Sequence, residues 1–279
     1  MSYLHPLRIL ETEAVRTSST IRDLCKEYRG VSAGSIAAVY MTLGFSTYRI
    51  EQLCREMFHH ILGDTIFDLE TFLTQRGGKN SAVIRDAINA VIIAEYGKDC
   101  VDISFQELFE RTGVSLRVYA AEINCEDPGS RQFSHESTPD MPVALAVAAS
   151  CAIPFLFTPV FFKGKLYVDG NTGIDQTLEN IKSTQNVIVL SVYANIESNI
   201  KMSFQGYIEC IINLLLSSMR KVHDMTRRDR ENVCLLCIQS ELTAKAIMEG
   251  SSQNVDKIIA AGAQREITET LLQFLGVRD

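Results

Sequence analysis

The chain has 279 residues, of which 46% are hydrophobic and 22% are charged, and its formal net charge is −7. These proportions are ordinary for a globular protein, and the acidic balance argues against binding of nucleic acid through a global basic field. No apolar stretch approaches the roughly 20 residues of a membrane-spanning helix. Residues 1–6 lack a basic segment followed by an apolar core, so no secretory leader is expected. We expect a cytoplasmic protein with a single domain over residues 1–279.

The eight cysteines and the paired histidines are not expected to bind metal. The cysteines lie mostly inside apolar runs, as reduced and buried thiols do, which favours a reducing compartment. Cys234 and Cys237 lie three positions apart in an expected strand, so their side chains should point to opposite faces. His59 and His60 are neighbours on an expected helix and cannot face one metal together. No metal and no cofactor is therefore expected.

The spacing of apolar residues predicts helices and short strands along the first two-thirds of the chain. Helices are expected over residues 4–15, 35–43, 46–62, 66–75, 81–96, 105–112 and 142–151, with a short turn over 18–25. Strands are expected over residues 26–29, 114–121, 133–135 and 165–168. Gly77 and Gly78 are expected to form a turn between two helices.

The last third of the chain is expected to be mostly helical. The apolar run 186–192 is typical of a central parallel strand that is buried on both faces. One further strand is expected over 232–239, with helices over 200–229, 241–249 and 254–274. Strands interleaved with helices indicate an α/β protein with a mainly parallel central sheet.

A serine lies between small residues just ahead of the helix expected over 35–43. The pentapeptide reads G-x-S-x-G and consists of Gly30, Val31, Ser32, Ala33 and Gly34. This pattern is typical of a nucleophile elbow, a sharp strand-to-helix turn that holds the serine at strained backbone angles. The N-terminus of the following helix would favour an anion that forms beside the serine. Alone the pentapeptide is weak evidence, because short Gly/Ser/Ala combinations occur by chance.

A serine hydroxyl needs a base to become a nucleophile, and the sequence offers more than one arrangement. An α/β-hydrolase triad would place an acid and then a histidine after Ser32, and only His223 is late enough in the chain. His223 lies inside an expected helix rather than after a strand, so a surface histidine is the favoured interpretation. An esterase that uses His223 remains an alternative.

A second stretch favours a different partner for the serine. Residues 146–159 spell A-x-x-A-S-x-x-I-P-x-x-F-x-P, and a short expected strand then leads to Asp169 and Gly170. With residues 30–35 and 112–119, these motifs resemble the patatin-like phospholipase family over about residues 4–195. The resemblance implies a three-layer α/β/α fold and a lipid acyl hydrolase, of phospholipase A or esterase type, that needs no metal. Residues 196–279 would be the helical C-terminal part of the same domain.

The resemblance implies a Ser-Asp dyad in place of a triad. Ser32 would attack the acyl ester, and Asp169 would take its proton. Such an aspartate needs a raised pKa or a short hydrogen bond in a dry site, and the apolar run 153–162 is well placed to exclude water. Gly170 would let the chain turn directly after the base, while Asn171 stands where the family has glycine or alanine.

Family members also carry a glycine-rich loop, ahead of a helix like that expected over 4–15, whose N–H groups form the oxyanion hole. We expect this loop to be missing, which leaves the Ala33 N–H as a candidate oxyanion donor. The alternative function is then a truncated or inactive relative that acts as a binding or interaction module.

The expected partner is a phospholipid or another acyl ester, with transient contact at a membrane surface. Four phenylalanines near Asp169 either form an interfacial lip for lipid or pack in the core, and core packing is the favoured interpretation. They are Phe155, Phe157, Phe161 and Phe162.

Overall fold

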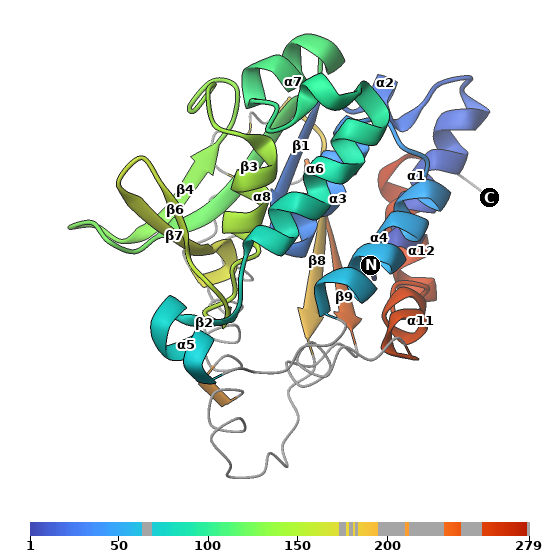
Figure 1. Ribbon diagram of the computed structural model, residues 1–279. Coiled ribbons are helices and arrows are strands. Elements are labelled where there is room, and N and C mark those ends of the chain that lie inside the picture. Colours follow the sequence, from blue (N-terminus) through green and yellow to red (C-terminus); the bar gives the residue numbers. More distant parts are fainter. Residues whose placement is uncertain are drawn as a thin grey trace.

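The computed structural model describes residues 1–62, 69–172, 177–178, 181, 184–194, 210–211, 232–240 and 253–277 (Figure 1). The helices are α1 (Leu4–Arg16), α2 (Ile21–Leu24), α3 (Ala33–Thr42), α4 (Thr47–Leu62), α5 (Leu69–Gln75), α6 (Ala82–Tyr96), α7 (Phe105–Thr112), α8 (Val143–Ser150), α11 (Gln253–Ala260) and α12 (Arg265–Phe274), with the 3₁₀ turns η1 (Lys98–Cys100) and η2 (Gly170–Thr172). The strands are β1 (Glu27–Val31), β2 (Gly77–Lys79), β3 (Ser115–Glu122), β4 (Gly129–Phe133), β5 (Phe155–Phe157), β6 (Val160–Phe162), β7 (Lys165–Asp169), β8 (Val187–Ala194) and β9 (Val233–Ser240).

Strand β3 is the centre of the main sheet. It pairs in parallel with β1 and antiparallel with β4 and β7, and β7 pairs in turn with β6. Two smaller parallel pairs join β2 to β5 and β8 to β9. Among the described strand pairs, β8/β9 is the longest, and it is parallel along its whole length. The α/β class with mostly parallel pairing is therefore confirmed.

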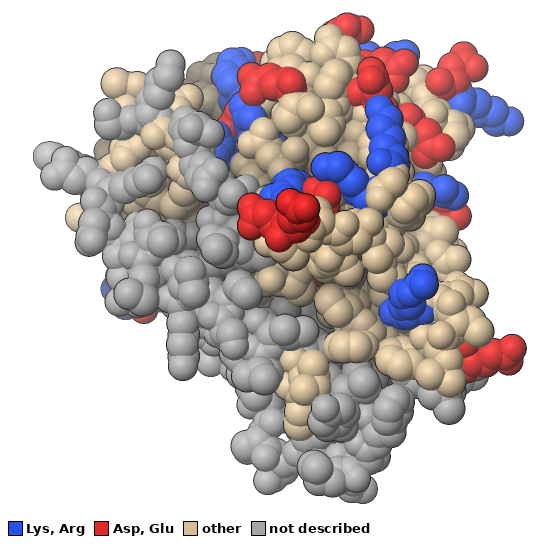
Figure 2. All heavy atoms as spheres, turned by 90° about the vertical axis from the view of Figure 1, so that its left-hand side faces the viewer, with Lys and Arg blue, Asp and Glu red and all other residues tan. Residues whose placement is uncertain are grey.

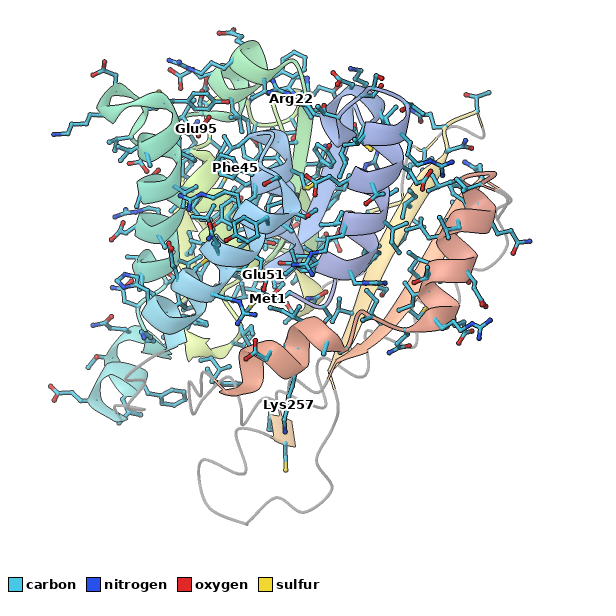
Figure 3. All side chains as sticks on the ribbon, turned by 90° about the vertical axis from the view of Figure 1, so that its right-hand side faces the viewer. Met1, Arg22, Phe45, Glu51, Glu95 and Lys257 are labelled. Carbon is cyan, nitrogen blue, oxygen red and sulfur yellow. The ribbon has the colours of Figure 1, made fainter. Side chains whose placement is uncertain are left out.

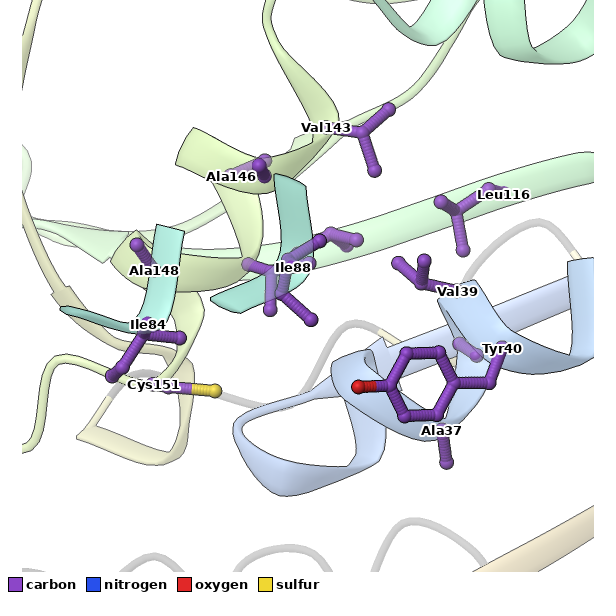
Figure 4. Close-up of a cluster of buried hydrophobic side chains, with 14 of the residues drawn as sticks. Ala37, Val39, Tyr40, Ile84, Ile88, Leu116, Val143, Ala146, Ala148 and Cys151 are labelled. Atoms are coloured by element: carbon purple, nitrogen blue, oxygen red, sulfur yellow. The ribbon is translucent and has the colours of Figure 1, made fainter. Parts of the chain in front are cut away.

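Helices α3, α6 and α8 cover one face of this sheet (Figures 1 and 4). The alternate side chains of β3 that face them, Leu116, Val118 and Ala120, are buried. Four alanines of α8 are buried as well, and such short side chains let the helix lie close to both β3 and α6. The close packing on this face fixes the end of α8, which lies at the candidate site.

The opposite face of β1 and β3 carries ion pairs near the start of both strands. Glu27 of β1 binds Arg29 on its own strand and Arg117 on β3, with N–O distances of 2.5 and 2.8 Å. Arg29 and Arg117 are opposite each other in the register, so the shared carboxylate separates two like charges. A second helical layer over this face stays a prediction.

Helices from both ends of the chain pack together on the side shown in Figure 3. Glu51 of α4 binds Arg8 of α1 and also Arg55, whose guanidinium lies 2.7 Å from Asp256 of α11. Apolar side chains of α1 and α12 contact β9 in a separate small core. The first and last described helices therefore cover the same part of the molecule.

Most helices expected in the first two-thirds are confirmed to within one or two residues, because their boundaries are encoded locally. Ser104 begins α7 with a capping box to Glu107, and Gly113 ends it in the left-handed conformation. The helix expected from residue 66 is described only from Leu69, as α5. The turn over 18–25 contains α2, which Thr20 caps.

Several predictions about strands are wrong. Gly77 and Gly78 begin β2 and form no turn: a Cβ at Gly77 would lie 2.3 Å from the Phe157 carbonyl carbon, so glycine permits the close pairing with β5. Strand β4 starts at Gly129 and ends at Phe133, so it precedes the strand expected over 133–135, because it pairs with β3. Strands β5 and β6 are not among the expected strands, because they lie in an apolar run in which apolar and polar residues do not alternate.

Two predictions about the last third are also wrong. Strand β8 is parallel as expected but only half-buried, with Val192 40% exposed, because among the described residues only β9 pairs with it. The helix expected over 254–274 is split into α11 and α12 at residues 261–264. A Cβ at Gly262 would lie 1.8 Å from the Ser2 carbonyl oxygen, so the chain passes too close to the N-terminal segment for a larger residue.

The helices expected over 200–229 and 241–249 lie outside the described residues, as does His223. Cys234 is buried and Cys237 is exposed on β9, which confirms that they point to opposite faces. Within the described ranges, every helix is too short or too polar to cross a bilayer.

Candidate active site

The pairing register explains how residues 137 positions apart meet. Val31, the last residue of β1, pairs with Tyr119, and Asp169, the last residue of β7, pairs with Ala120. Strand β4 occupies the other edge of β3 at both positions, so β1 and β7 lie along the same edge and run toward each other. Residues that follow Val31 must therefore come close to the end of β7.

The backbone turns abruptly at Ser32, between β1 and α3. Ser32 has φ 51° and ψ −131°, a conformation that residues with a side chain rarely adopt and that costs energy. Gly30 permits the turn, because a Cβ there would lie 2.4 Å from the Ser35 Cα. Gly34 is different: a Cβ at this position would meet no atom within 4 Å. The strained elbow expected from the pentapeptide is present.

The Ser32 hydroxyl donates a hydrogen bond of 2.6 Å to Oδ2 of Asp169. Asp169 is completely buried, whereas Ser32 is half-buried and its neighbour Ala33 is exposed. Burial raises the pKa of Asp169 to about 6, although the hydrogen bonds from Ser32 and Asn171 act in the opposite direction. At this site, a serine hydroxyl that is partly exposed to solvent is bonded to a buried carboxylate whose affinity for a proton is raised.

The second carboxylate oxygen and the backbone of Asp169 are also held. The Asn171 N–H donates to Oδ1 at 2.8 Å, and the Asp169 N–H donates to the Ala152 carbonyl at 2.9 Å. A Cβ at Gly170 would lie 2.3 Å from the Tyr119 carbonyl oxygen, so only glycine fits directly after Asp169. Because Asn171 contributes its backbone N–H, this contact does not require glycine or alanine at that position.

The first turn of α3 presents free donors beside Ser32. Among the described residues, the Ala33 and Gly34 N–H groups have no hydrogen-bond partner, as is usual for the first residues of a helix. The Ser32 N–H, in contrast, donates to Oγ of Ser150 at 2.8 Å. An oxyanion that forms on an acyl group bonded to the Ser32 Oγ could therefore accept from the Ala33 and Gly34 N–H groups, whereas the Ser32 N–H is already engaged.

The described part of the chain offers neither a histidine nor a metal cluster at this position. His5 bonds to Thr268, and His135 stacks on Phe109 with ring centroids 3.9 Å apart. His60 is exposed on α4, and the side chains that bind Asp169 are those of Ser32 and Asn171. The described residues contain no group of three or more His, Cys, Asp or Glu side chains that could bind a metal ion.

Comparison with known proteins places the chain in a family. A family model described as Patatin-like phospholipase matches residues 16–173, more than half of the chain. The chain belongs to this family. The match includes both Ser32 and Asp169, and it includes the end of α8 between them.

Two viral proteins are similar to this patatin-like chain. Uncharacterized protein R571 of Acanthamoeba polyphaga mimivirus is 25% identical over 203 residues, which cover 70% of this chain and 65% of the relative. Probable lipid hydrolase 463L of Invertebrate iridescent virus 6 is 29% identical over 146 residues, which cover 50% of this chain and 48% of the relative. The chain thus spans less than two-thirds of the length of either relative.

Two bacterial structures also align with the patatin-like chain. VipD from Legionella pneumophila aligns over 94% of this chain and 64% of its own, with 14% identity and a TM-score of 0.44. The type III effector protein ExoU aligns over 98% of this chain and 50% of its own, with 13% identity and a TM-score of 0.45. ExoU belongs to the type III secretion system of Pseudomonas aeruginosa.

Sequence reasoning missed the residues that hold the elbow in place. The Ser35 hydroxyl donates to the Ser32 carbonyl at 2.6 Å, and the Ser150 hydroxyl donates to the Tyr119 carbonyl at 2.6 Å. Ser35 follows the pentapeptide directly, and Ser150 is the serine of the A-x-x-A-S block, so both lay within motifs whose individual roles the pattern alone does not reveal.

Proposed function

We propose that this patatin-like protein hydrolyses acyl esters of lipids, with Ser32 as the nucleophile and Asp169 as its base. The observation that carries the proposal is the 2.6 Å hydrogen bond from the Ser32 hydroxyl to a buried carboxylate. The family match and a probable viral lipid hydrolase at low identity support a lipid hydrolase in general terms.

The proposed reaction uses the two residues in sequence. Asp169 accepts the Ser32 proton while Oγ attacks the ester carbonyl carbon, and the Ala33 and Gly34 N–H groups stabilise the resulting oxyanion. The proton on Asp169 passes to the departing alcohol, which leaves an acyl group on Ser32. Water then attacks the acyl carbon while Asp169 takes its proton. The bond from that carbon to the Ser32 Oγ breaks, Asp169 returns the proton to Oγ, and the fatty acid leaves. A pKa of about 6 lets Asp169 both take and return a proton near neutral pH.

We further propose transient contact with a lipid surface through the β6–β7 hairpin. The four phenylalanines considered above differ in exposure: Phe157 is buried, Phe155 and Phe162 are half-buried, and Phe161 is 66% exposed. Lys163 follows at the turn, with Nζ 5.2 Å from the Phe162 ring centroid. An exposed aromatic ring beside a lysine suits the boundary between acyl chains and anionic headgroups.

The distribution of charge on the described surface fits contact with lipid at the hairpin alone better than contact through a broad basic surface. On the face that contains this hairpin, acidic and basic side chains are interspersed between large uncharged areas (Figure 2). Lys163 itself lies only 4.0 Å from Asp140, which reduces its net effect. We propose a cytoplasmic protein that visits membranes, and we propose no nucleic-acid partner.

The test compares the wild-type chain with Ser32→Ala on a short-chain fluorogenic ester and on phospholipid vesicles. A control is Ser134→Ala, which removes a buried serine hydroxyl that bonds to Ser137 and makes no contact with Ser32 or Asp169 among the described hydrogen bonds. We expect activity in the wild type and the control, and none above background in Ser32→Ala. A folded wild type as inactive as Ser32→Ala would instead indicate a binding module, and loss of activity in His223→Ala would favour the histidine-dependent alternative.

A further inference from the structure

The backbone of Ser32 is held by a serine from a distant helix. Ser150, the last residue of α8, is completely buried, and its Oγ accepts the Ser32 N–H at 2.8 Å. The same hydroxyl donates its only proton to the Tyr119 carbonyl at 2.6 Å. Because a hydroxyl donates once, this second bond turns the oxygen lone pairs of Ser150 toward the Ser32 N–H.

The same short segment also holds Asp169. The Ala152 carbonyl, two residues after Ser150, accepts the Asp169 N–H at 2.9 Å. The end of α8 therefore binds the backbones of both Ser32 and Asp169. The remaining contact at the elbow comes from Ser35, whose hydroxyl and N–H both bind the Ser32 carbonyl. Both polar backbone groups of the strained residue thus have a fixed partner.

We infer that Ser150 is a positioning residue for Ser32: its hydroxyl holds the strained elbow so that the Ser32 Oγ stays within hydrogen-bond reach of Asp169. This inference rests on the proposed function. A left-handed backbone at a residue other than glycine persists only when its surroundings determine it. Removal of the Ser150 hydroxyl leaves the Ser32 N–H and the Tyr119 carbonyl without their partner, so the elbow is released toward ordinary backbone angles and Oγ moves away from the carboxylate.

The proton affinity of Asp169 reports this movement. Its hydrogen bond from Ser32 lowers the pKa of Asp169 and so partly offsets burial, which means that its loss raises the pKa further. The other groups that face the carboxylate are Asn171, which does not titrate, and the Cys151 thiol. Burial raises the pKa of Cys151 far above its usual range, so the thiol stays neutral throughout the working pH range. The acid limb of the pH–rate profile therefore reports Asp169.

The experiment compares Ser150→Ala with Ser134→Ala, a control that also removes a fully buried serine hydroxyl with hydrogen-bond partners. Thermal unfolding, kcat and KM on a short-chain ester, and kcat/KM from pH 4 to 9 are measured for both variants and the wild type. For Ser150→Ala we expect kcat to fall at least 10-fold with KM within twofold, and the acid limb to move to higher pH. Ser134→Ala should lose comparable thermal stability but keep its kcat and its acid limb.

The inference is overturned if folded Ser150→Ala keeps its kcat within twofold and its acid limb unmoved. A second variant, Ser150→Cys, is used if Ser150→Ala fails to fold. Its thiol fills nearly the same space as the hydroxyl, but its sulfur is only a weak acceptor for the Ser32 N–H. We expect Ser150→Cys to fold and to show the same loss of kcat. Failure of both variants to fold would assign Ser150 a purely structural role and overturn the inference. A wild type as inactive as Ser32→Ala would instead refute the proposed function itself.

Discussion

Replacement of Asp169 by asparagine should make the protein more stable at neutral pH while it strongly lowers activity. Asp169 is completely buried, and burial raises its pKa from 3.8 to about 6. The carboxyl therefore binds a proton more tightly in the folded than in the unfolded chain. Asparagine has nearly the same shape and can still accept the Asn171 N–H, but it carries no charge to bury.

The size and the sign of the effect follow from linkage. Because the folded pKa is the higher one, the stability from this group is fully present below pH 3.8 and is lost as pH rises through about 6. A rise in pKa from 3.8 to about 6 corresponds to about 3 kcal/mol of free energy of unfolding at pH 8. Asp169→Asn avoids this loss, so its free energy of unfolding should exceed that of the wild type by about that amount at pH 8 and by only about 0.5 kcal/mol at pH 4.

Denaturant unfolding of both proteins at pH 4, 6 and 8 measures this difference, because every other group titrates alike in the two chains. Asp140→Asn is the matched control, since its side chain is 82% exposed and its loss should change little at any pH. Activity of Asp169→Asn should fall by about 10²–10⁴-fold, the usual contribution of a general base. If the variant is no more stable than the wild type at pH 8, the carboxyl is not held in a dry site and the reasoning fails.

The two glycines of the elbow should respond differently to alanine. Gly30→Ala should lower the free energy of unfolding by about 1–3 kcal/mol, because its Cβ would meet the first turn of α3. Gly34→Ala should leave it unchanged or raise it by up to about 1 kcal/mol. Thermal unfolding of the two variants measures the difference. Phe161→Ser should weaken binding to anionic phospholipid vesicles several-fold in a sedimentation assay. Val15→Ser, which changes a side chain that is 68% exposed on α1, should leave vesicle binding unchanged, and equal binding by both variants would remove the hairpin from the proposal.

The elements that could be predicted from the sequence are those whose signals are local. The helices α4, α6 and α7 have apolar residues at helical spacing and clear boundaries, such as the capping box at Ser104. The strands β5 and β6 have only three residues each and no alternation, so nothing local distinguishes them from a loop. They become strands because β5 pairs with β2, which is distant in the sequence, and β6 pairs with β7, which follows it.

Glycine was ambiguous for the same reason. Two adjacent glycines usually mark a turn, yet the small size of Gly77 permits close pairing of β2 with β5, in which Gly77 lies opposite Phe155. The half-exposed β8 is a further case, since a continuous apolar run does not reveal how many neighbours a strand has. In both cases the deciding contact joins segments that lie far apart in the chain.

The candidate site combines both kinds of information. Ser32 and Asp169 could be selected because each lies in a short motif. The geometry that brings their side chains within 2.6 Å depends on strand pairing at adjacent positions of β3, and no motif specifies this pairing. Ser150 lies in a motif too, but its role depends on two hydrogen bonds to other strands and turns. A serine at the end of α8 reaches the Ser32 N–H only because small side chains let α8 lie close to β3. The alanines of that block and its serine therefore act together: the alanines permit the approach, and the serine uses it to hold the elbow.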